Sequence, residues 1–383
     1  MPFDFDTPID RRNSDSMKWS RYAGRDVIPL WVADMDFAAP PAVLTAIHQR
    51  IDHGVFGYAK PWPSLTRSVM DHLQSHYDWK VEPSWIVWIP GVVAAFNVAC
   101  RAVGGTGASV FTATPVYPPF LTAPEHSGRH LVTLPLVQNA QNWAWDFEAV
   151  DKTLSESRAR MWLLCHPHNP VGRVWNDTEL QTIADLAEKH DLVVCSDEIH
   201  CGLVLDPSLR HRPLAALSPA IAKRTITLMA PSKTFNIPAL YSAFAVIPDP
   251  ALRRAFNQVM DGIMPHINTL GLVATEAAYR ECDDWHQALI AYLRDNAKLV
   301  EAEIATMPGL SMTPVEATYL AWIDCRGLCR EKGIDNPQRF FETAGVGLSD
   351  GRDFGLPGFV RLNFGCPRQV LIQALSRIRT AVQ

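Results

Sequence analysis

The chain has 383 residues, of which 48% are hydrophobic, and a net charge of −5. This length is enough for one large hydrophobic core and a smaller second core. The sequence has no basic block or tail, which excludes the charge pattern of a nucleic-acid-binding protein. No apolar run approaches the roughly 18 residues of a membrane span, and the first residues lack the apolar segment of a signal peptide. We therefore expect a small-molecule partner, with no nucleic acid and no membrane.

Short apolar, β-branched runs alternate with helix-like segments through the middle of the chain. This alternation is typical of βαβ units and a largely parallel sheet. The predicted strands are 108–112, 160–165, 192–196, 225–229 and 243–247. Predicted helices lie between them, for example at 94–103 and at 177–190, where 176–179 (NDTE) has the form of an N-terminal cap. The expected fold is α/β, with a mostly parallel central sheet flanked by helices.

The pattern changes near residue 284. A long amphipathic helix is predicted at 285–307, followed by a strand region with many Gly and Pro residues at 308–366 and a closing helix. The first forty residues are rich in turn formers and are expected to wrap onto this region. We therefore predict a large domain at 41–283 and a smaller α+β domain formed by 1–40 and 284–383.

The eight cysteines form no CxxC pair, and several lie in apolar runs that predict burial. Scattered, unpaired cysteines are typical of a reducing compartment, so the expected location is the cytoplasm. Cys165, His166 and His168 lie close together in the sequence, but the prolines of this stretch, Pro167 and Pro170, prevent a regular set of metal ligands. No metal site is expected.

Polar residues follow several predicted strands, which is where ligands bind in open α/β sheets. These stretches are 90–93 (PGVV), 168–172 (HNPVG), 196–200 (SDEIH) and 232–234 (SKT). Lys233 stands in a nearly uncharged segment, so it is either an ordinary loop lysine or one whose amine is used. Asp197 and Glu198 end an apolar strand, and side-chain alternation lets only one of them face a ligand. Arg361 lies in an apolar strand, where a buried guanidinium requires an anion: a ligand carboxylate or an internal ion pair.

The motifs NPVG (169–172), SDEIH (196–200) and SKTFN (232–236) resemble, in this order, those of the fold-type I pyridoxal 5′-phosphate (PLP) enzymes of the aminotransferase class I/II superfamily. Within that superfamily, WVADMDF (31–37) and FVRLNFGCPR (359–368) are similar to the MalY/PatB-type cystathionine β-lyases. The resemblance runs from about residue 12 to residue 368. Each motif is weak alone, but four key residues in order, separated by 28 (169 to 197), 36 (197 to 233) and 128 (233 to 361) residues, are specific together.

The resemblance implies PLP as cofactor and assigns roles around its ring. Lys233 would be the Schiff-base lysine and the base that removes the substrate Cα proton. Asp197, rather than Glu198, would hold the pyridine nitrogen protonated. Asn169 would donate to the phenolate oxygen, with His200 as a further cofactor contact. Tyr117 would stack on the ring, although a core tyrosine reads the same in the sequence.

The phosphate and the substrate have their own predicted contacts. Gly91, Val92 and Val93 open a predicted helix, whose free N–H groups can bind a phosphate. Ser232 could add a hydroxyl, and Tyr58 resembles the tyrosine that reaches the phosphate from a neighbouring subunit. This implies a homodimer with the site at its interface. Arg361 would bind the substrate α-carboxylate, with Ala33 and Asp34 lining the substrate side.

The implied reaction is β-elimination from L-cystathionine, cysteine or S-conjugates, which gives pyruvate, ammonia and a thiol. The alternative is an aminotransferase of the same fold. Two departures weaken it: aminotransferases commonly carry an arginine and a serine where this chain has Tyr241 and Ala230. A further alternative is a regulatory binding protein, because some family members bind a transcriptional regulator, but no surface patch for such a partner is identifiable in the sequence.

Overall fold

The computed structural model describes residues 3–139 and 141–383 and is built around a seven-stranded sheet. Its strand order is β2 (Ile86–Ile89), β10 (Ala243–Val246), β9 (Thr225–Met229), β8 (Val193–Asp197), β7 (Ala159–Cys165), β3 (Ser109–Thr114) and β4 (His130–Pro135). The strands from β9 to β4 are parallel, whereas β10 is antiparallel to both of its neighbours. The predicted α/β fold with a mostly parallel sheet is confirmed.

The five strands predicted from apolar runs correspond to β3, β7, β8, β9 and β10. They were recognisable because β8, β9 and β10 are buried over nearly their whole length. The edge strand β4 was not predicted, because its side chains are partly or fully exposed and it carries no continuous apolar run. An edge strand with one open side gives a weaker sequence signal than a central strand.

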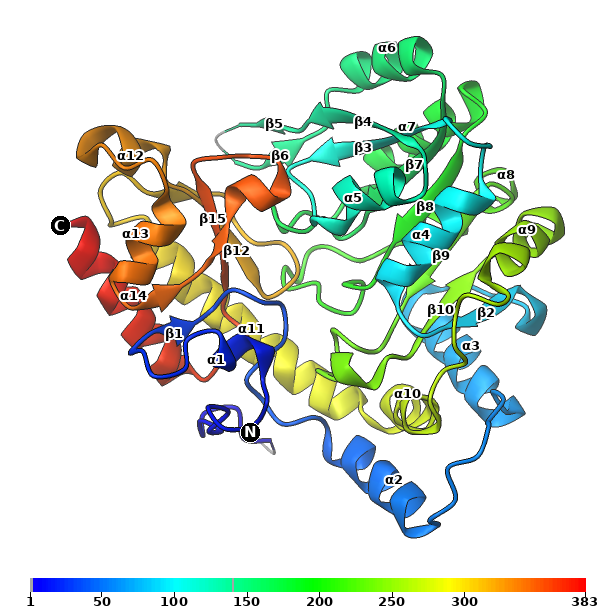
Figure 1. Ribbon diagram of the computed structural model, residues 1–383, viewed down its shortest axis with the longest axis horizontal. Helices are drawn as coiled ribbons and strands as arrows, with labels where there is room; N and C mark the ends of the chain where they lie inside the picture. Colours follow the sequence, from blue (N-terminus) through cyan, green and yellow to red (C-terminus); the bar gives the residue numbers. More distant parts are fainter. Residues whose placement is uncertain (1–2, 140) are drawn as a thin grey trace.

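Helices cover both faces of this sheet (Figure 1). They are α4 (Val92–Ala102), α5 (Pro119–His126), α6 (Phe147–Ser157), α7 (Asp177–Lys189), α8 (Pro219–Ala222) and α9 (Pro250–Met260). The predicted cap of α7 is a complete capping box: the Glu179 amide donates to Asn176 Oδ1 at 3.0 Å, and the Asn176 amide donates to Glu179 Oε2 at 2.9 Å. Two buried apolar clusters fill the space between the sheet and its helices.

A second sheet forms the C-terminal part of the molecule. Its order is β11 (Ser311–Met312), β12 (Leu320–Asp324), β15 (Phe359–Asn363) and β14 (Ser349–Asp350), all antiparallel. The helices of this part are α11 (Asp283–Ile304), α12 (Arg326–Lys332), α13 (Pro337–Thr343) and α14 (Arg368–Val382). The N-terminal segment joins it, because β1 (Ile28–Pro29) pairs in parallel with β13 (Val346–Gly347). The segment that leads into β1 and the C-terminal helix α14 therefore lie on the side of the molecule that carries β12 and β15 (Figure 1).

The remaining elements include α1 (Met17–Ser20), α2 (Pro41–Asp52), α3 (Pro63–Tyr77), α10 (Thr269–Glu281) and the two-stranded ribbon of β5 (Val137–Gln138) and β6 (Trp143–Ala144). Val69 and Leu73 of α3 pack against β9 and β10 of the central sheet. Helix α10 packs against both α2 and α3. Among the described helices, none combines the length and the apolar composition needed to span a bilayer.

Candidate active site

Three neighbouring parallel strands, β7, β8 and β9, end at the same edge of the central sheet. Asp197 is the last residue of β8 and lies in register with Cys165 of β7 and Leu228 of β9. Because parallel strands point the same way, the segments that follow them meet at this edge. Asn169 and Lys233 are therefore brought to either side of Asp197, although the three residues are far apart in the sequence.

A cavity of about 690 Å³ opens at this edge. It is lined by the predicted residues Ala33, Gly91, Val92, Val93, Tyr117, Asn169, Asp197, His200, Ser232, Lys233 and Arg361, and also by Met17, Val32, Pro90, Cys165, Ala230, Tyr241 and others. Eleven of the thirteen predicted site residues thus converge on one cavity. The two exceptions are Asp34 and Tyr58.

Lys233 reaches the cavity from the loop that follows β9. Its Nζ donates a hydrogen bond to the backbone carbonyl of Ala33 at 2.6 Å. Loss of hydration, with the Arg361 charge nearby, lowers the pKa of the Lys233 amine to about 8. The amine is thus easily obtained in its neutral, nucleophilic form, unlike that of a solvated lysine.

Asp197 is buried, with 4% of its surface exposed, and Oδ1 accepts from the amide of Ile199 at 3.1 Å. Burial raises the pKa of this carboxyl to about 7. Glu198 points the other way: its Oε2 bonds to Nε2 of His211 at 2.7 Å, and it does not line the cavity. Of the two carboxylates, which the residues alone could not separate, Asp197 lines the cavity and Glu198 does not.

Arg361 extends from the second sheet, on β15, toward the same cavity. Nη1 donates to Asn169 Oδ1 at 2.9 Å, and Nη2 donates to the carbonyl of Trp31 at 3.0 Å. Nε has no partner among the described residues, and none of the hydrogen bonds of the guanidinium goes to a carboxylate there. An internal ion pair therefore does not explain the burial of Arg361, and an anion is still required from a ligand.

The hydrogen bond from Arg361 also orients Asn169. Because Oδ1 accepts from the guanidinium, the amide nitrogen of Asn169 is the end left for the cavity. The backbone of Asn169 is held as well, since its carbonyl accepts from the Tyr117 amide at 3.1 Å and its amide donates to Cys165 Sγ at 3.3 Å. Asn169 is thus a fixed hydrogen-bond donor beside Asp197.

The N-terminus of α4 forms another wall of the cavity. Its N-cap is Gly91, and no side chain caps the first turn. The first turn carries no acidic residue, and Val92 and Val93 place apolar side chains there. Uncapped backbone amides at a helix start are a binding site for an anionic group.

Tyr117 and His200 complete the lining. Burial raises the pKa of the Tyr117 hydroxyl, so it remains protonated at neutral pH. Burial lowers the pKa of His200 well below its usual range, with help from the charges of Lys233 and Arg361, so this imidazole is neutral. The His200 Nδ1 atom is buried without a partner in the described part of the chain.

Two predicted residues lie outside the cavity. The carboxylate of Asp34 is held by Arg11, with Nη2 and Oδ2 at 2.6 Å, and it does not line the cavity. The prediction that Asp34 lines the substrate side therefore has no support in this geometry; the neighbouring Val32 and Ala33 form that wall instead. Tyr58 is fully exposed, at 103% of its reference surface, and contributes nothing to the cavity of its own chain.

Sequence reasoning missed several supporting residues. The Ser349 hydroxyl donates to the carbonyl of Trp31 at 2.7 Å and accepts from Arg361 Nη2 at 3.4 Å. These bonds help to hold the guanidinium of Arg361 in place. Tyr319 is buried and donates to the carbonyl of Ala33 at 2.9 Å, so that carbonyl receives both Tyr319 and Lys233. Neither residue stands in a motif, and only the folded arrangement shows their role.

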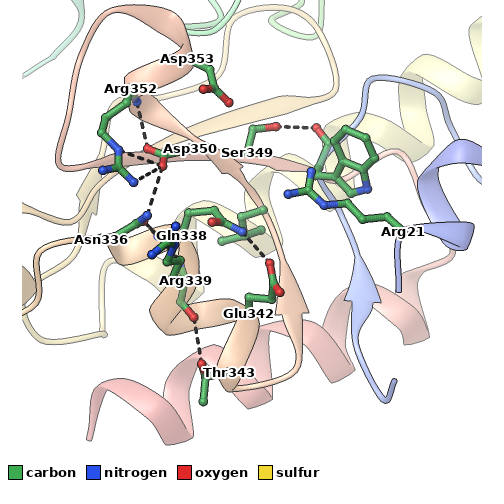
Figure 2. Close-up of a pocket in the computed structure, with 12 residues that line it drawn as sticks. Arg21, Asn336, Gln338, Arg339, Glu342, Thr343, Ser349, Asp350, Arg352 and Asp353 are labelled. Atoms are coloured by element: carbon green, nitrogen blue, oxygen red, sulfur yellow. Dashed lines mark hydrogen bonds and ion pairs between the residues drawn. The ribbon is translucent and has the colours of Figure 1, made fainter. Parts of the chain in front are cut away.

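A neighbouring cavity of about 540 Å³ lies behind Trp31 and Ser349 (Figure 2). Figure 2 shows Asp350 between Arg352 and Asn336, with Arg352 Nη2 at 2.6 Å from Asp350 Oδ2. The guanidinium of Arg21 lies over the Trp31 ring, 4.6 Å from its centroid. This region supports the wall behind Arg361 rather than extending the first cavity.

The arrangement fits PLP on four independent features. An amine with a lowered pKa suits the aldehyde, a buried carboxyl suits a protonated pyridine nitrogen, a fixed amide donor suits the phenolate, and an uncapped helix start suits the phosphate. By contrast, the cluster of Cys165, His166 and His168 is dispersed. His166 Nε2 bonds to the carbonyl of Arg212 at 3.1 Å, and His168 Nε2 bonds to that of Pro115 at 2.8 Å.

Comparison with known proteins agrees with this fit. The family model "Aminotransferase class I and II" matches residues 25–378. Cystathionine beta-lyase PatB of Bacillus subtilis (strain 168) is 37% identical over 388 residues, covering 99% of each chain. The crystal structure of OvoB is 46% identical, with a TM-score of 0.96, covering 100% of this chain and 99% of that one. Cystalysin from Treponema denticola, whose crystal structure contains PLP, is 33% identical with a TM-score of 0.94, covering 100% of this chain and 99% of that one.

The fold and the site define a PLP-dependent enzyme of fold type I. More particularly, the chain belongs to the aminotransferase class I and II family and, within it, to the cystathionine β-lyase group of carbon–sulfur lyases.

Proposed function

We propose that this enzyme catalyses β-elimination from S-substituted cysteines such as L-cystathionine, releasing pyruvate, ammonia and a thiol. The observation that carries the proposal is the pairing, in one cavity, of an amine with a lowered pKa, Lys233, and a buried guanidinium without an anion, Arg361. Lys233, through the cofactor that it would carry, serves the α-amino group of an amino acid, and Arg361 binds its α-carboxylate. The similarity to cystathionine β-lyases supports elimination at the β carbon.

Binding of the substrate rests on the residues that hold its carboxylate. Arg361 has an unused Nε–H, and the bonds to Asn169, Trp31 and Ser349 hold its guanidinium plane in place. Because the guanidinium is already held in one orientation, it loses little side-chain conformational entropy when it binds a carboxylate. The substrate is thereby oriented with its Cα toward the side of the cavity where Lys233 lies.

Proton movement rests on Lys233. When bound, PLP supplies an electron sink that makes the Cα–H of an attached amino acid acidic. Lys233 Nζ, whose pKa is lowered to about 8, takes this proton as general base. The Cα–H electron pair then forms the Cα–Cβ double bond as the C–S bond breaks, and sulfur leaves with its electron pair. Lys233 or the protonated Tyr117 gives sulfur a proton, and the released aminoacrylate takes up water to give pyruvate and ammonia.

Asp197 and Asn169 act on the electronics of the site. Burial raises the pKa of Asp197 to about 7, because the ionised carboxylate is poorly solvated there. A cationic N–H partner would stabilise the ionised form, so Asp197 favours a protonated ring nitrogen. Asn169 donates to the ring oxygen from a fixed position. The positions of Ala230 and Tyr241, both in the cavity wall, lack the serine and arginine common in aminotransferases, which supports the lyase over a transaminase.

The assembly that we propose is a homodimer in which Tyr58 reaches the phosphate corner of the partner site. Tyr58 lies on the segment between α2 and α3, where Val55 and Phe56 are also largely exposed, at 61% and 58%. Adjacent exposed apolar side chains on a soluble surface favour burial against another chain. The N-terminus of α4, which has no cationic side chain of its own chain in its first turn, leaves room for such a contribution.

Two further expectations remain part of the proposal. The large domain would comprise 41–283 and the small domain 1–40 with 284–383; the division is supported by the two separate sheets and by the pairing of β1 with β13. A cytoplasmic location is supported by the cysteines, all eight of which are free thiols within residues 3–139 and 141–383.

The decisive experiment supplies L-cystathionine to the PLP-loaded enzyme without any keto acid. We expect pyruvate and free thiol in equal amounts, and no product from Lys233→Ala. In parallel, the enzyme receives an amino donor with 2-oxoglutarate. Turnover in the second assay without pyruvate and thiol in the first would replace the lyase by an aminotransferase.

A further inference from the structure

Two histidines and an aspartate lie together where α3 meets the start of α11, and none of the three lines the cofactor cavity. His72 and His76 lie four residues apart on α3, and Asp283 is the first residue of α11. One ligand atom of each lies within 4.8 Å of those of the other two. His76 Nε2 and Asp283 Oδ1 are 3.4 Å apart. Residues at i and i+4 of a helix share one face, so both imidazoles can contact the same bound ion.

The surroundings of His72 provide a second observation. Only 7% of this residue is exposed, and its Nδ1 atom is buried without a hydrogen-bond partner in the described part of the chain. Its ring stacks on those of His76 and Tyr279, with centroids 4.0 and 4.3 Å away. A polar imidazole enclosed in this way loses water without gaining a partner, which costs free energy unless a ligand is bound.

We propose that His72, His76 and Asp283 bind one transition-metal ion of the Zn²⁺ class. Imidazole nitrogen with one carboxylate is a preferred ligand set for such ions, whereas Ca²⁺ and Mg²⁺ prefer oxygen alone. A tetrahedral ion with bonds of about 2.1 Å spaces its ligand atoms about 3.4 Å apart. The His76 to Asp283 separation already has this value, and water fills the fourth position.

The ion would join two parts of the chain. Helix α3 packs on α10 beside the central sheet, and α11 continues from Asp283 to the core beneath the second sheet (Figure 1). An ion held by α3 and by the first turn of α11 therefore resists separation of these helices. None of its three ligands lines the cofactor cavity, so its role is structural and β-elimination does not require it.

The test uses the PLP-loaded enzyme and Zn²⁺ alone, titrated in competition with a chromophoric chelator. We expect one Zn²⁺ per chain and a higher unfolding temperature in its presence. His76→Gln and Asp283→Asn each remove one ligand from an exposed position and should lower the affinity by about 10- to 100-fold or more. His126→Gln, which changes another exposed histidine, is the matched control and should bind as the wild type does.

A second measurement distinguishes metal binding at this site from metal binding by cysteine thiols. Co²⁺ in the site should give visible ligand-field bands without thiolate charge-transfer absorption, and these bands should disappear in His76→Gln. Failure of the wild type to bind Zn²⁺, Zn²⁺ binding by both variants as tight as that of the wild type, or a thiolate spectrum would each overturn the proposal. The rate of β-elimination is expected to be unchanged in His76→Gln.

Discussion

Nη1 of Arg361 donates a hydrogen bond to Oδ1 of Asn169 at 2.9 Å, which joins the second sheet to the loop after β7 of the central sheet. The bond links the guanidinium of Arg361, which has no carboxylate partner among the described residues, to the side-chain amide of Asn169. In the proposed function, this bond connects the residue that binds the substrate carboxylate with the residue that contacts the cofactor. A change at Arg361 is expected to affect substrate binding and cofactor contact, in different proportions.

Arg361→Ala should raise KM for L-cystathionine by about 10- to 1000-fold, because a charge-assisted pair with the α-carboxylate is lost. The affinity for PLP should fall less, through the loss of the bond to Asn169. Steady-state kinetics and a PLP titration measure the two effects separately. Arg352→Ala, which removes an exposed arginine paired with Asp350, is the control and should leave KM within about twofold. An unchanged KM in Arg361→Ala would remove this residue from the substrate site.

Lys233→Ala and Lys233→Arg should both abolish β-elimination, since neither supplies a nucleophilic amine. In the wild type, borohydride should leave a pyridoxyl adduct that peptide mass spectrometry places on Lys233, and both variants should lack it. Because the pKa of the amine is lowered to about 8, the rate of PLP capture by the cofactor-free chain should rise with pH and level off above about 8. Stopped-flow absorbance measures this rate. An adduct on another lysine would contradict the assignment.

Asp197→Asn should stabilise the cofactor-free chain at pH 8 but not at pH 4. The pKa of Asp197 is about 7 in the folded chain and about 3.9 when unfolded. Between these values the folded state keeps a proton that the unfolded state has released, so stability falls as pH rises, by up to about 1.4 kcal/mol per pH unit. Asn carries no such cost. Urea unfolding at both pH values measures the difference.

The control for that experiment is Asp185→Asn, the same carboxylate-to-amide change at an exposed position. With PLP bound, Asp197→Asn should instead be strongly impaired in β-elimination, because the ring nitrogen loses its acidic partner. If Asp197→Asn is no more stable than wild type at pH 8 without PLP, the buried carboxylate of Asp197 does not destabilise the folded chain, and the prediction is wrong.

Hybrid dimers should reveal whether Tyr58 acts across subunits. Tyr58→Ala and Lys233→Ala are expected to give weak or inactive homodimers at limiting PLP. If Tyr58 serves the partner site, a mixed dimer has one site with both defects and one intact site, so an equal mixture should recover about a quarter of the wild-type activity. If Tyr58 serves its own subunit, each site in the mixed dimer keeps one defect. Activity at the level of the separate variants would therefore exclude the shared site.

Much of this protein could be predicted from local sequence. Continuous apolar runs predicted β7, β8 and β9, because a central parallel strand is buried on both faces and needs apolar residues at nearly every position. The cap of α7 was predictable because Asn176 and Glu179 bond within one turn. Lys233 stood out because a lysine in an uncharged segment needs an explanation. Each of these signals depends on residues that are neighbours in the chain.

Tertiary structure decided what depends on distant neighbours. The sequence left open whether Arg361 forms an internal ion pair, and only the fold shows its bonds to Asn169, Trp31 and Ser349. Asp34 stands in a recognisable motif, yet its carboxylate pairs with Arg11 and does not line the cavity. The physical reason is that a side chain's hydration, charge partners and hydrogen bonds are set by whatever packing brings next to it, and a linear pattern encodes those contacts only indirectly.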